Sequence, residues 1–308
     1  MRISDKFKLE KIDSVISSLN LDRKNCSTEF LNLNKCITYC NKKNFILKFN
    51  FDKNFLNFSN NEISGYKNSN NLSKIYNIPK YETLINSEEI HVAKIEYLEK
   101  KKGNYFNCNK FIKGIDDKKK NYLKTNVNAY LSKIKKKYET VLTLDDKKKI
   151  NYEINLFLNK EGEFILPINI SHGDFVHWNT RIYKSKYYCY DLEQYDEERL
   201  YCYDVIHWYF MPFFQKIKFL KSNLIKKKLT SFFDLYLQKI LKTNFSDFRS
   251  EDYYKFFYLY LVEKKMYYLM LNNSNNIIEK TSSNYYSQLI YLSKIIQEVI
   301  DNFLNVNE

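Results

Sequence analysis

Alternating apolar and polar positions in the first hundred residues predict a small antiparallel sheet. Residues 36–40 and 45–49 each read as a short strand, and the polar stretch between them is typical of a hairpin turn. Residues 78–81 and 91–98 have the same character and predict two further strands. A helix is expected to open at residues 61–66, between the two pairs of strands. This part of the chain is therefore predicted to combine a sheet with at least one helix.

The pattern changes farther along the chain. Residues 163–170 and 186–190 still read as short strands, whereas residues 99–160 predict helical or mixed structure with charged outer faces. From Asp204 onward apolar residues recur at helical spacings, with a last helix expected over residues 285–304. No linker rich in Gly, Pro or Ser interrupts the chain. The sequence therefore predicts an α+β protein whose later part is mainly helical.

The segment between the strands 163–170 and 186–190 carries the most evident chemistry. It reads S-H-G-D-F-V-H-W-N from Ser171 to Asn179, and Asn179 and Thr180 are expected to form a turn. The spacing from Asp174 to Asn179 matches the H-R-D-x-x-x-x-N loop of protein kinases, and Asp191 follows where D-F-G provides a metal ligand. Phosphoryl transfer needs a group that orients a hydroxyl and oxygen ligands for Mg²⁺. The segment therefore predicts a phosphoryl-transfer site.

These residues also carry a family resemblance. In H-G-D-F-x-x-W-N, in the later D-L-E and in Y-D-V-I-H at 203–207, the chain resembles the aminoglycoside phosphotransferase and choline kinase-like family of small-molecule kinases. It looks most like bacterial members associated with surface-polysaccharide biosynthesis, although His177 stands where such relatives commonly have Pro. The resemblance implies a protein kinase-like two-lobed α+β fold. A small N-terminal antiparallel sheet lobe would comprise residues 1–98, and a larger, mainly helical C-terminal lobe residues 99–308.

The resemblance also implies roles for individual residues. Asp174 would be the catalytic base, and Asn179 and Asp191 would be the Mg²⁺ ligands. His172 would be structural, and Asp204 would begin a buried helix and brace the catalytic loop.

The nucleotide-binding half is expected upstream of this segment. Kinases pair a strand Lys with a helix Glu to hold the α and β phosphates. Lys48 at the end of a predicted strand and Glu62 at the start of a predicted helix occur in that order and are expected to form this ion pair. The resemblance implies that backbone groups near Glu96 and Leu98 would contact adenine, in the hinge between the lobes. A glycine-rich phosphate loop is missing, because no glycine lies within residues 30–39.

Composition limits the classes of partner. A hydrophobic content of 44% and an aromatic content of 17% argue against disorder. The formal net charge of +14 raises nucleic acids, anionic membranes and anionic substrates as partners. The lysines, however, occur in short bursts over several predicted helices, which is typical of solvated faces. Without a zinc-finger spacing or an RNA-binding signature, no specific nucleic-acid partner is expected.

The sequence also bears on cellular location. The cysteines form no C-x-x-C motif, and the N-terminus lacks an apolar signal core. The aromatic run 205–220 is interrupted by polar residues and predicts a buried core helix, so no transmembrane segment is expected. The simplest expectation is a cytoplasmic protein with reduced thiols.

These observations predict an Mg²⁺-dependent kinase that uses ATP or GTP to phosphorylate a hydroxyl of a small molecule, in surface-polysaccharide biosynthesis. Aromatic residues and lysines in the C-terminal helices favour a sugar or sugar derivative as acceptor, but nearby carboxylates leave an amino alcohol open; these are Glu193, Asp196, Glu197 and Glu198. Two alternatives stay open. One is a catalytically inactive pseudokinase or nucleotide-binding scaffold, suggested by the missing glycine loop, and the other is a basic nucleic-acid-binding protein.

Overall fold

The chain forms two compact units in the computed structural model. The first unit comprises Met1–Lys118 and His172–Asp196, and the second comprises Lys119–Ser171 and Glu197–Glu308. The predicted division at residue 98 stays a prediction. The structure describes residues 5–32, 35–40, 44–51, 56–68, 77–87, 89–98, 122–140, 142–183, 186–217, 220 and 222–275. The helix expected over residues 285–304 lies outside these ranges.

The predicted N-terminal sheet is confirmed. Its strands are hydrogen-bonded antiparallel in the order β1-β2-β3-β5-β4. In the register of the three central strands, Lys48 pairs with Ile37 on one side and with Ala93 on the other. The strand bounds are β1 Cys26–Asn32, β2 Lys35–Cys40, β3 Phe45–Asn50, β4 Tyr81–Asn86 and β5 His91–Glu96.

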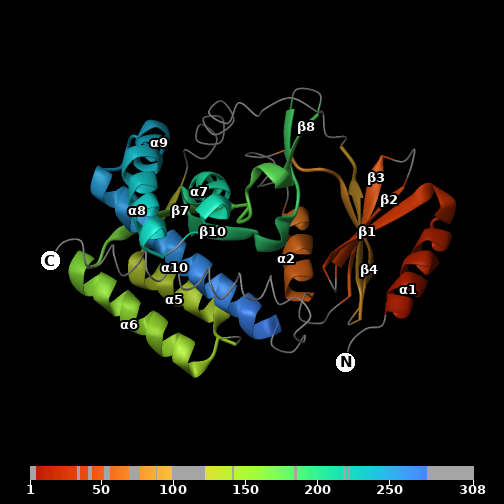
Figure 1. Cartoon of the computed structure of the whole chain (residues 1–308), viewed down its shortest axis with the longest axis horizontal. Coiled ribbons are helices and arrows are strands. Elements are labelled where there is room, and N and C mark those ends of the chain that lie inside the picture. Colours follow the sequence, from red (N-terminus) through yellow and green to blue (C-terminus); the bar gives the residue numbers. More distant parts are fainter. Residues whose placement is uncertain are drawn as a thin grey trace. The chain divides into compact units, whose positions relative to one another are not determined.

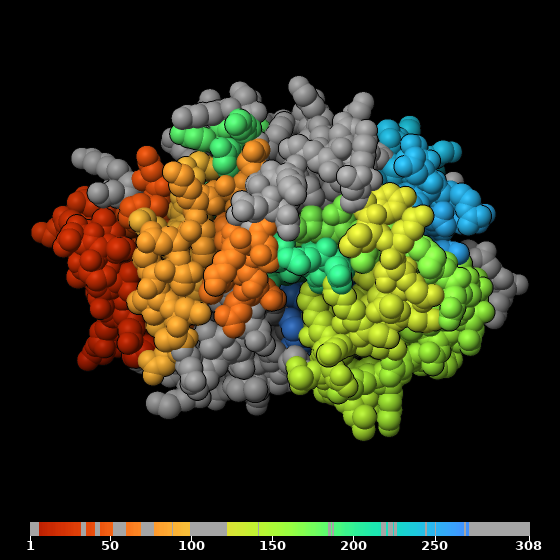
Figure 2. Space-filling view, turned by 180° about the vertical axis from the view of Figure 1, so that it is seen from behind, coloured from red at the N-terminus to blue at the C-terminus, as the bar shows by residue number. Residues whose placement is uncertain are grey.

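Alternation along the strands gives this sheet two different faces. The helix α1 (Asp5–Ser18) covers one face, where its Ile12 and Ile16 pack with Leu47 and Phe49 of β3. Figure 2 shows α1 (red) directly against the strands of residues 81–96 (amber). The next helix in the first unit, α2 (Leu56–Lys67), lies on the opposite side of the sheet from α1 (Figure 1). Lys48 lies one residue from Leu47 and therefore belongs to the face turned away from α1.

The helix α2 differs from its predicted start. It begins at Leu56 rather than at residue 61, so Glu62 lies in its middle. Gly65, one turn after Glu62, lies against residues 192–195: a Cβ at Gly65 would be 2.9 Å from Leu192 Cβ and 3.1 Å from Tyr195 Cβ. A residue without a side chain is needed for this close approach. Gly65 therefore lets α2 pack closely against residues 192–195.

Two other predictions about local structure need correction. The strand β4 begins at Tyr81, so residues 78–80 do not belong to it; Pro79 lacks the N–H that a paired strand residue donates. Thr180 is not a turn residue but the start of β8 (Thr180–Tyr183), which pairs antiparallel with β9 (Lys186–Cys189). The first unit also contains the short helices η1 (Arg23–Asn25), η3 (His177–Asn179) and η4 (Leu192–Gln194).

The second unit is mainly helical. Its strands lie in the order β10-β7-β6, and α10 runs alongside α5 and α7 (Figure 1). Asn126 caps α5, and Thr143 and Asp146 form a capping box at α6. The bounds are β6 Leu123–Asn126, α5 Val127–Tyr138, α6 Leu144–Glu161, β7 Ile165–Ser171, β10 Asp196–Leu200, α7 Tyr203–Ile217, α8 Ser222–Phe232, the π-helix η5 Phe233–Leu237, α9 Gln238–Asn244 and α10 Ser250–Asn275.

Aromatic side chains fill the core of the second unit. Phe210 and Phe214 of α7 are buried, and the Phe210 ring lies 5.7 Å from the ring of Phe257 on α10. The helix α7 is thus the buried core helix expected for residues 205–220. Within the described ranges, no helix combines the length and the apolar character needed to cross a membrane.

Candidate active site

His172, two residues before Asp174, has a buried side chain. Its Nδ1 accepts a hydrogen bond from the backbone N–H of Asp174 at 3.3 Å, and its Nε2 lies 2.7 Å from the carbonyl oxygen of Tyr190. The ring therefore carries its proton on Nε2 and donates it to Tyr190. Gly173 has a φ of +83°, which a residue with a side chain rarely adopts. His172 thus ties the Asp174 loop to the residue that precedes Asp191.

Asp174 and Asn179 are joined directly. The Asn179 Nδ2 donates to Asp174 Oδ2 at 2.9 Å and to the Asp174 carbonyl oxygen at 3.0 Å. The Tyr190 N–H donates to the Asn179 carbonyl at 2.8 Å, which closes a ring of contacts with His172. Because its amide nitrogen faces Asp174, the Asn179 side chain has its oxygen left to offer to a cation. This frame holds the predicted base and the predicted metal ligand in one arrangement.

Asp191 has a strained backbone. Its φ of +66° lies in the left-handed region, where Asp is tolerated better than most residues with a side chain. Such a conformation costs roughly 1 to 3 kcal/mol and persists when surrounding contacts hold it. Those contacts come from two lysines: Lys48 Nζ lies 2.7 Å and Lys35 Nζ 3.7 Å from Asp191 Oδ1.

These residues belong to a larger group of charges, here called the carboxylate cluster: Glu62, Asp191 and Glu193 with the ammonium groups of Lys35 and Lys48. Lys48 Nζ contacts Glu62 at 2.8 Å and Glu193 at 2.8 Å. Lys35 Nζ contacts Glu193 at 2.6 Å. Lys48 and Glu62, expected to pair from the sequence, therefore lie in contact within a buried network. The Glu62 side chain is fully buried, whereas that of Asp191 is 29% exposed.

The electrostatics of the cluster follow from its composition. Burial opposes the charge on Lys48, but Asp191, Glu193 and Glu62 raise its pKa well above the ordinary value. Burial likewise opposes the charge on Asp191, but Lys35 and Lys48 hold its pKa below the ordinary value. Burial raises the pKa of Glu62 to about 7. Among the described residues, carboxylates outnumber ammonium groups in the cluster, and the excess negative charge favours a bound cation.

The donor set of the cluster suits a divalent cation. One oxygen from each of Glu62, Asp191 and Glu193 lies within 4.8 Å of the others. Carboxylate oxygens are among the ligands that Mg²⁺ prefers, and Asn179 stays a predicted further ligand. The residues therefore fit the metal that the sequence predicts, with Asp191 and Glu193 as the partly exposed carboxylates.

Sequence reasoning missed the parts played by Lys35 and Glu193. Lys35 is the first residue of β2, which pairs with β1. Its side chain is only 13% exposed, so it is not one of the solvated lysines. The signal for Glu193 was the D-L-E motif, in which two carboxylates lie two residues apart. No local pattern distinguishes Lys35 from the other lysines of this chain.

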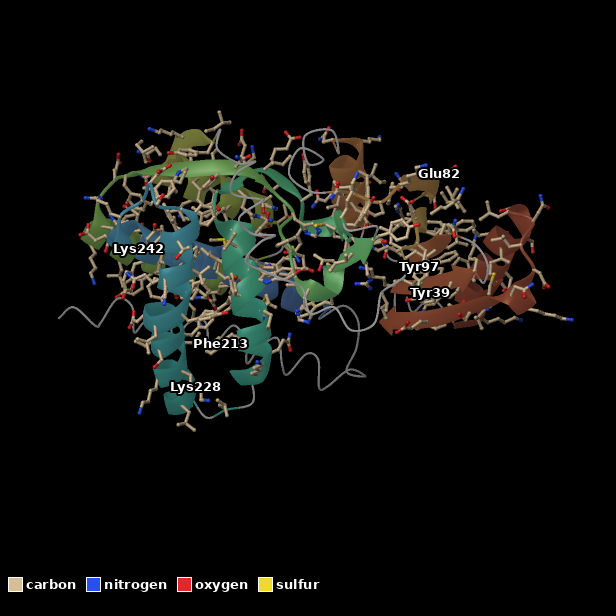
Figure 3. All side chains as sticks on the ribbon, turned by 90° about the horizontal axis from the view of Figure 1, so that it is seen from above. Tyr39, Glu82, Tyr97, Phe213, Lys228 and Lys242 are labelled. Atoms are coloured by element: carbon tan, nitrogen blue, oxygen red, sulfur yellow. The ribbon has the colours of Figure 1, made fainter. Side chains whose placement is uncertain are left out.

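The backbone groups predicted to meet the nucleotide base are engaged by a side chain. The Leu98 N–H donates to the Tyr190 hydroxyl oxygen at 3.1 Å, and that hydroxyl donates to the Glu96 carbonyl oxygen at 3.2 Å. Nearby, the rings of Tyr39 and Tyr97 meet edge to face at 5.9 Å (Figure 3). These contacts were not foreseen from the sequence.

Asp204 lies in the second unit, in the first turn of α7. Its side chain is fully buried, and its Oδ1 accepts a hydrogen bond from Ser171 Oγ at 2.7 Å. Ser171 ends β7 and directly precedes His172. The predicted role of Asp204 as a brace of the catalytic loop remains a prediction.

No protein-family profile matches the sequence, and no curated protein matches it significantly. Solved structures are similar in fold. The amicoumacin kinase hAmiN in complex with AMP-PNP and Ca²⁺ has a TM-score of 0.56 at 13% identity, over 98% of this chain and 94% of that one. The choline kinase LicA from Streptococcus pneumoniae has a TM-score of 0.56 at 15% identity, over 94% and 98%. Aminoglycoside phosphotransferase APH(4)-Ia has a TM-score of 0.54 at 9% identity, over 96% and 98%. The chain therefore has the protein kinase-like α+β fold of the aminoglycoside phosphotransferases and choline kinases that its sequence resembles.

Proposed function

We propose that this chain transfers the γ-phosphoryl group of ATP or GTP to a hydroxyl of a small molecule. The observation that carries the proposal is the contact of Lys48 with both Glu62 and Asp191, beside the frame that joins Asp174 to Asn179. Phosphoryl transfer depends on positioned cations and an oriented acceptor more than on covalent chemistry by the protein. This arrangement supplies both.

The chain's own residues divide the work. Asp174 orients the acceptor hydroxyl and takes its proton, and Asn179 holds the Asp174 carboxylate in place. Asn179 and Asp191 would hold Mg²⁺, which supplies charge neutralisation on the phosphates when bound. Lys48 and Lys35 provide ammonium groups for the phosphate oxygens. The glycine loop amides are thus replaced in part by the side chain of Lys35.

The acceptor is proposed to be a sugar, a sugar derivative or an amino alcohol. The solved structures of similar fold are kinases of small molecules, namely amicoumacin, choline and aminoglycosides. A role in surface-polysaccharide assembly remains part of the proposal, supported by the H-G-D-F-x-x-W-N wording at 172–179.

The test combines turnover with nucleotide binding. ADP formation is measured with Mg²⁺, ATP or GTP and a panel of sugars and amino alcohols. Asp174→Asn is expected to lower turnover roughly 100- to 10,000-fold, the usual contribution of a positioned base. Its thermal stabilisation by nucleotide should persist, because ligand binding to the folded state acts by mass action. Asp145→Asn, at an exposed position of α6, is the matched control. Unchanged turnover in Asp174→Asn would exclude Asp174 as the base.

A nucleotide-binding scaffold without turnover is the second candidate. It is favoured by the missing glycine loop and by the engagement of Glu96 and Leu98 with Tyr190. This candidate predicts that nucleotides stabilise the protein against heat but that no ADP forms, either without an acceptor or with any acceptor of the panel.

A further inference from the structure

Tyr190 connects the strand β9 to Asp191 and contacts the backbone of Glu96 and Leu98. It follows the last residue of β9 and precedes Asp191, so one step of the chain separates the base end of the site from the metal end. Its hydroxyl accepts from the Leu98 N–H and donates to the Glu96 carbonyl. One N–H donor and one carbonyl acceptor side by side are what the edge of a purine base would need. A single phenol satisfies both.

Packing fixes the Tyr190 ring as well as its hydroxyl. The ring packs against the apolar group of Ile46, Ala93 and Ile95, which lies on the sheet face away from α1. The guanidinium of Arg181 lies 5.8 Å from the ring centre. A phenol hydroxyl can accept one hydrogen bond and donate another at the same time, as it does here with Leu98 and Glu96. The side chain therefore uses both the apolar surface and the polar groups that a base would use.

We propose that Tyr190 occupies the base subsite, so that the native chain binds its phosphoryl donor mainly through the phosphate end. This inference rests on the proposed function and names the donor chemistry of that same site. A base that enters the subsite must displace the phenol and replace its two hydrogen bonds. The free energy gained by binding the base is therefore mostly cancelled by the loss of the phenol's contacts. The phosphate end carries Lys35 and Lys48, and neither of them contacts Tyr190 in the described network.

The consequence is a donor site with little base preference. Each hydrogen bond exchanged at the subsite is worth about 1 kcal/mol net, and one tenfold step in affinity is about 1.4 kcal/mol. Loss of the two bonds to Glu96 and Leu98, together with the apolar contact, therefore corresponds to at least about tenfold in base-dependent affinity. Inorganic tripolyphosphate carries the phosphates without the base and measures the phosphate end alone.

The experiment compares MgATP and Mg-tripolyphosphate by titration calorimetry on the full chain. In the native chain the two ligands are expected to bind within about threefold of each other. In Tyr190→Ala, MgATP should bind at least about tenfold more tightly than in the native chain, with tripolyphosphate unchanged. Tyr190→Phe should make the Leu98 amide exchange its hydrogen faster, because its acceptor is lost. Tyr188→Ala, two residues earlier in β9, is the matched control and should change the binding of neither ligand.

Three results would count against the inference. A native chain that prefers MgATP by tenfold or more, with Tyr190→Ala binding it equally or less tightly, would show that Tyr190 supports the base and would leave the proposed function intact. An equal change for both ligands in Tyr190→Ala would assign the effect to the Asp191 loop and not to base competition. Binding of neither ligand by the native chain or Tyr190→Ala would overturn the proposed function, and this inference with it.

Discussion

Replacement of Lys48 by methionine tests whether the carboxylate cluster is one coupled group. Lys48→Met keeps an unbranched side chain, one atom shorter, but removes an ammonium group that contacts Glu62, Asp191 and Glu193 at 2.7 to 2.8 Å. Removing one partner of a buried ion pair costs roughly 3 to 5 kcal/mol, because the other partner stays buried without compensation. Lys35 remains beside Asp191, whose side chain is partly exposed. The expected loss in the free energy of unfolding is therefore near the lower end, about 3 kcal/mol.

The charge balance of the cluster also predicts how the stability changes when Glu62 is replaced, alone and together with Lys48. The cluster has three carboxylates against two ammonium groups, an excess of one. Glu62→Gln removes one carboxylate, so it should cost less than about 1 kcal/mol although Glu62 is fully buried. In the Lys48→Met background, Glu62→Gln should restore about 1 to 2 kcal/mol, because it removes a carboxylate that has lost its partner. The two substitutions are therefore expected to be strongly non-additive.

The assay is urea unfolding at pH 7 followed by tryptophan fluorescence. All variants carry Trp208→Phe, so that Trp178 is the remaining tryptophan and reports on the first unit. Lys94→Met is the control, because Lys94 forms a half-exposed pair with Glu82 at 2.9 Å and should cost less than about 1 kcal/mol. Equal costs for Lys48→Met and Glu62→Gln that add within about 0.5 kcal/mol would refute the coupled cluster.

Three further predictions concern other residues of the first unit. Lys35→Met should weaken MgATP binding about tenfold or more, through loss of a charge-assisted bond, and calorimetry that shows no change would remove Lys35 from the phosphate end. Gly65→Ala should destabilise the first unit by about 1 to 3 kcal/mol because its Cβ would overlap Leu192, whereas Ser64→Ala, at an exposed position, should stay within about 0.5 kcal/mol in the same urea assay. His91 is buried, and burial lowers its pKa to about 4 from an ordinary 6.5. The unfolded chain therefore binds the proton more tightly, so His91 contributes stability above pH 6.5 that is lost as the pH falls to 4. In His91→Gln, the free energy of unfolding measured in the urea assay should depend less on pH between 6.5 and 4.

Much of the first unit could be predicted because its signals are local. The hairpin of β2 and β3 follows from alternation on either side of a polar turn. The ion pair of Lys48 and Glu62 follows from the order of a strand Lys and a helix Glu, whose side chains meet at 2.8 Å. The spacing of Asp174 and Asn179 predicted a base and a metal ligand, roles that stay predictions, whereas the hydrogen bond between their side chains was not predicted. In each case neighbouring residues in the sequence carry the information.

The features that escaped prediction depend on contacts between distant segments. Lys35 meets Glu193 across 158 residues, and Tyr190 meets Leu98 across 92. Nothing near Lys35 separates it from the many lysines that face solvent. The strand predicted from residue 78 begins only at Tyr81, although the Lys80 carbonyl accepts a hydrogen bond from the Glu96 N–H of β5. Pro79 has no N–H to donate to a neighbouring strand. Side chain to backbone contacts such as those of Tyr190 leave no periodicity to read.

The first unit is built from two separate segments of the chain, and this affects the order in which its contacts can form during synthesis. The five-stranded sheet of the first unit lies in the first hundred residues. The segment His172–Asp196, which completes the first unit, comes after Lys119–Ser171 of the second unit. Lys48 and Glu62 are 14 residues apart and can pair early, whereas Lys48 and Asp191 are 143 residues apart. At roughly 5 to 20 residues per second, the ribosome needs about 7 to 30 s to supply that second partner. During this interval Glu62 is the carboxylate of the cluster that can balance the charge of Lys48. We therefore expect Glu62 to stabilise the fold most in the nascent chain, before Asp191 and Glu193 have been synthesised.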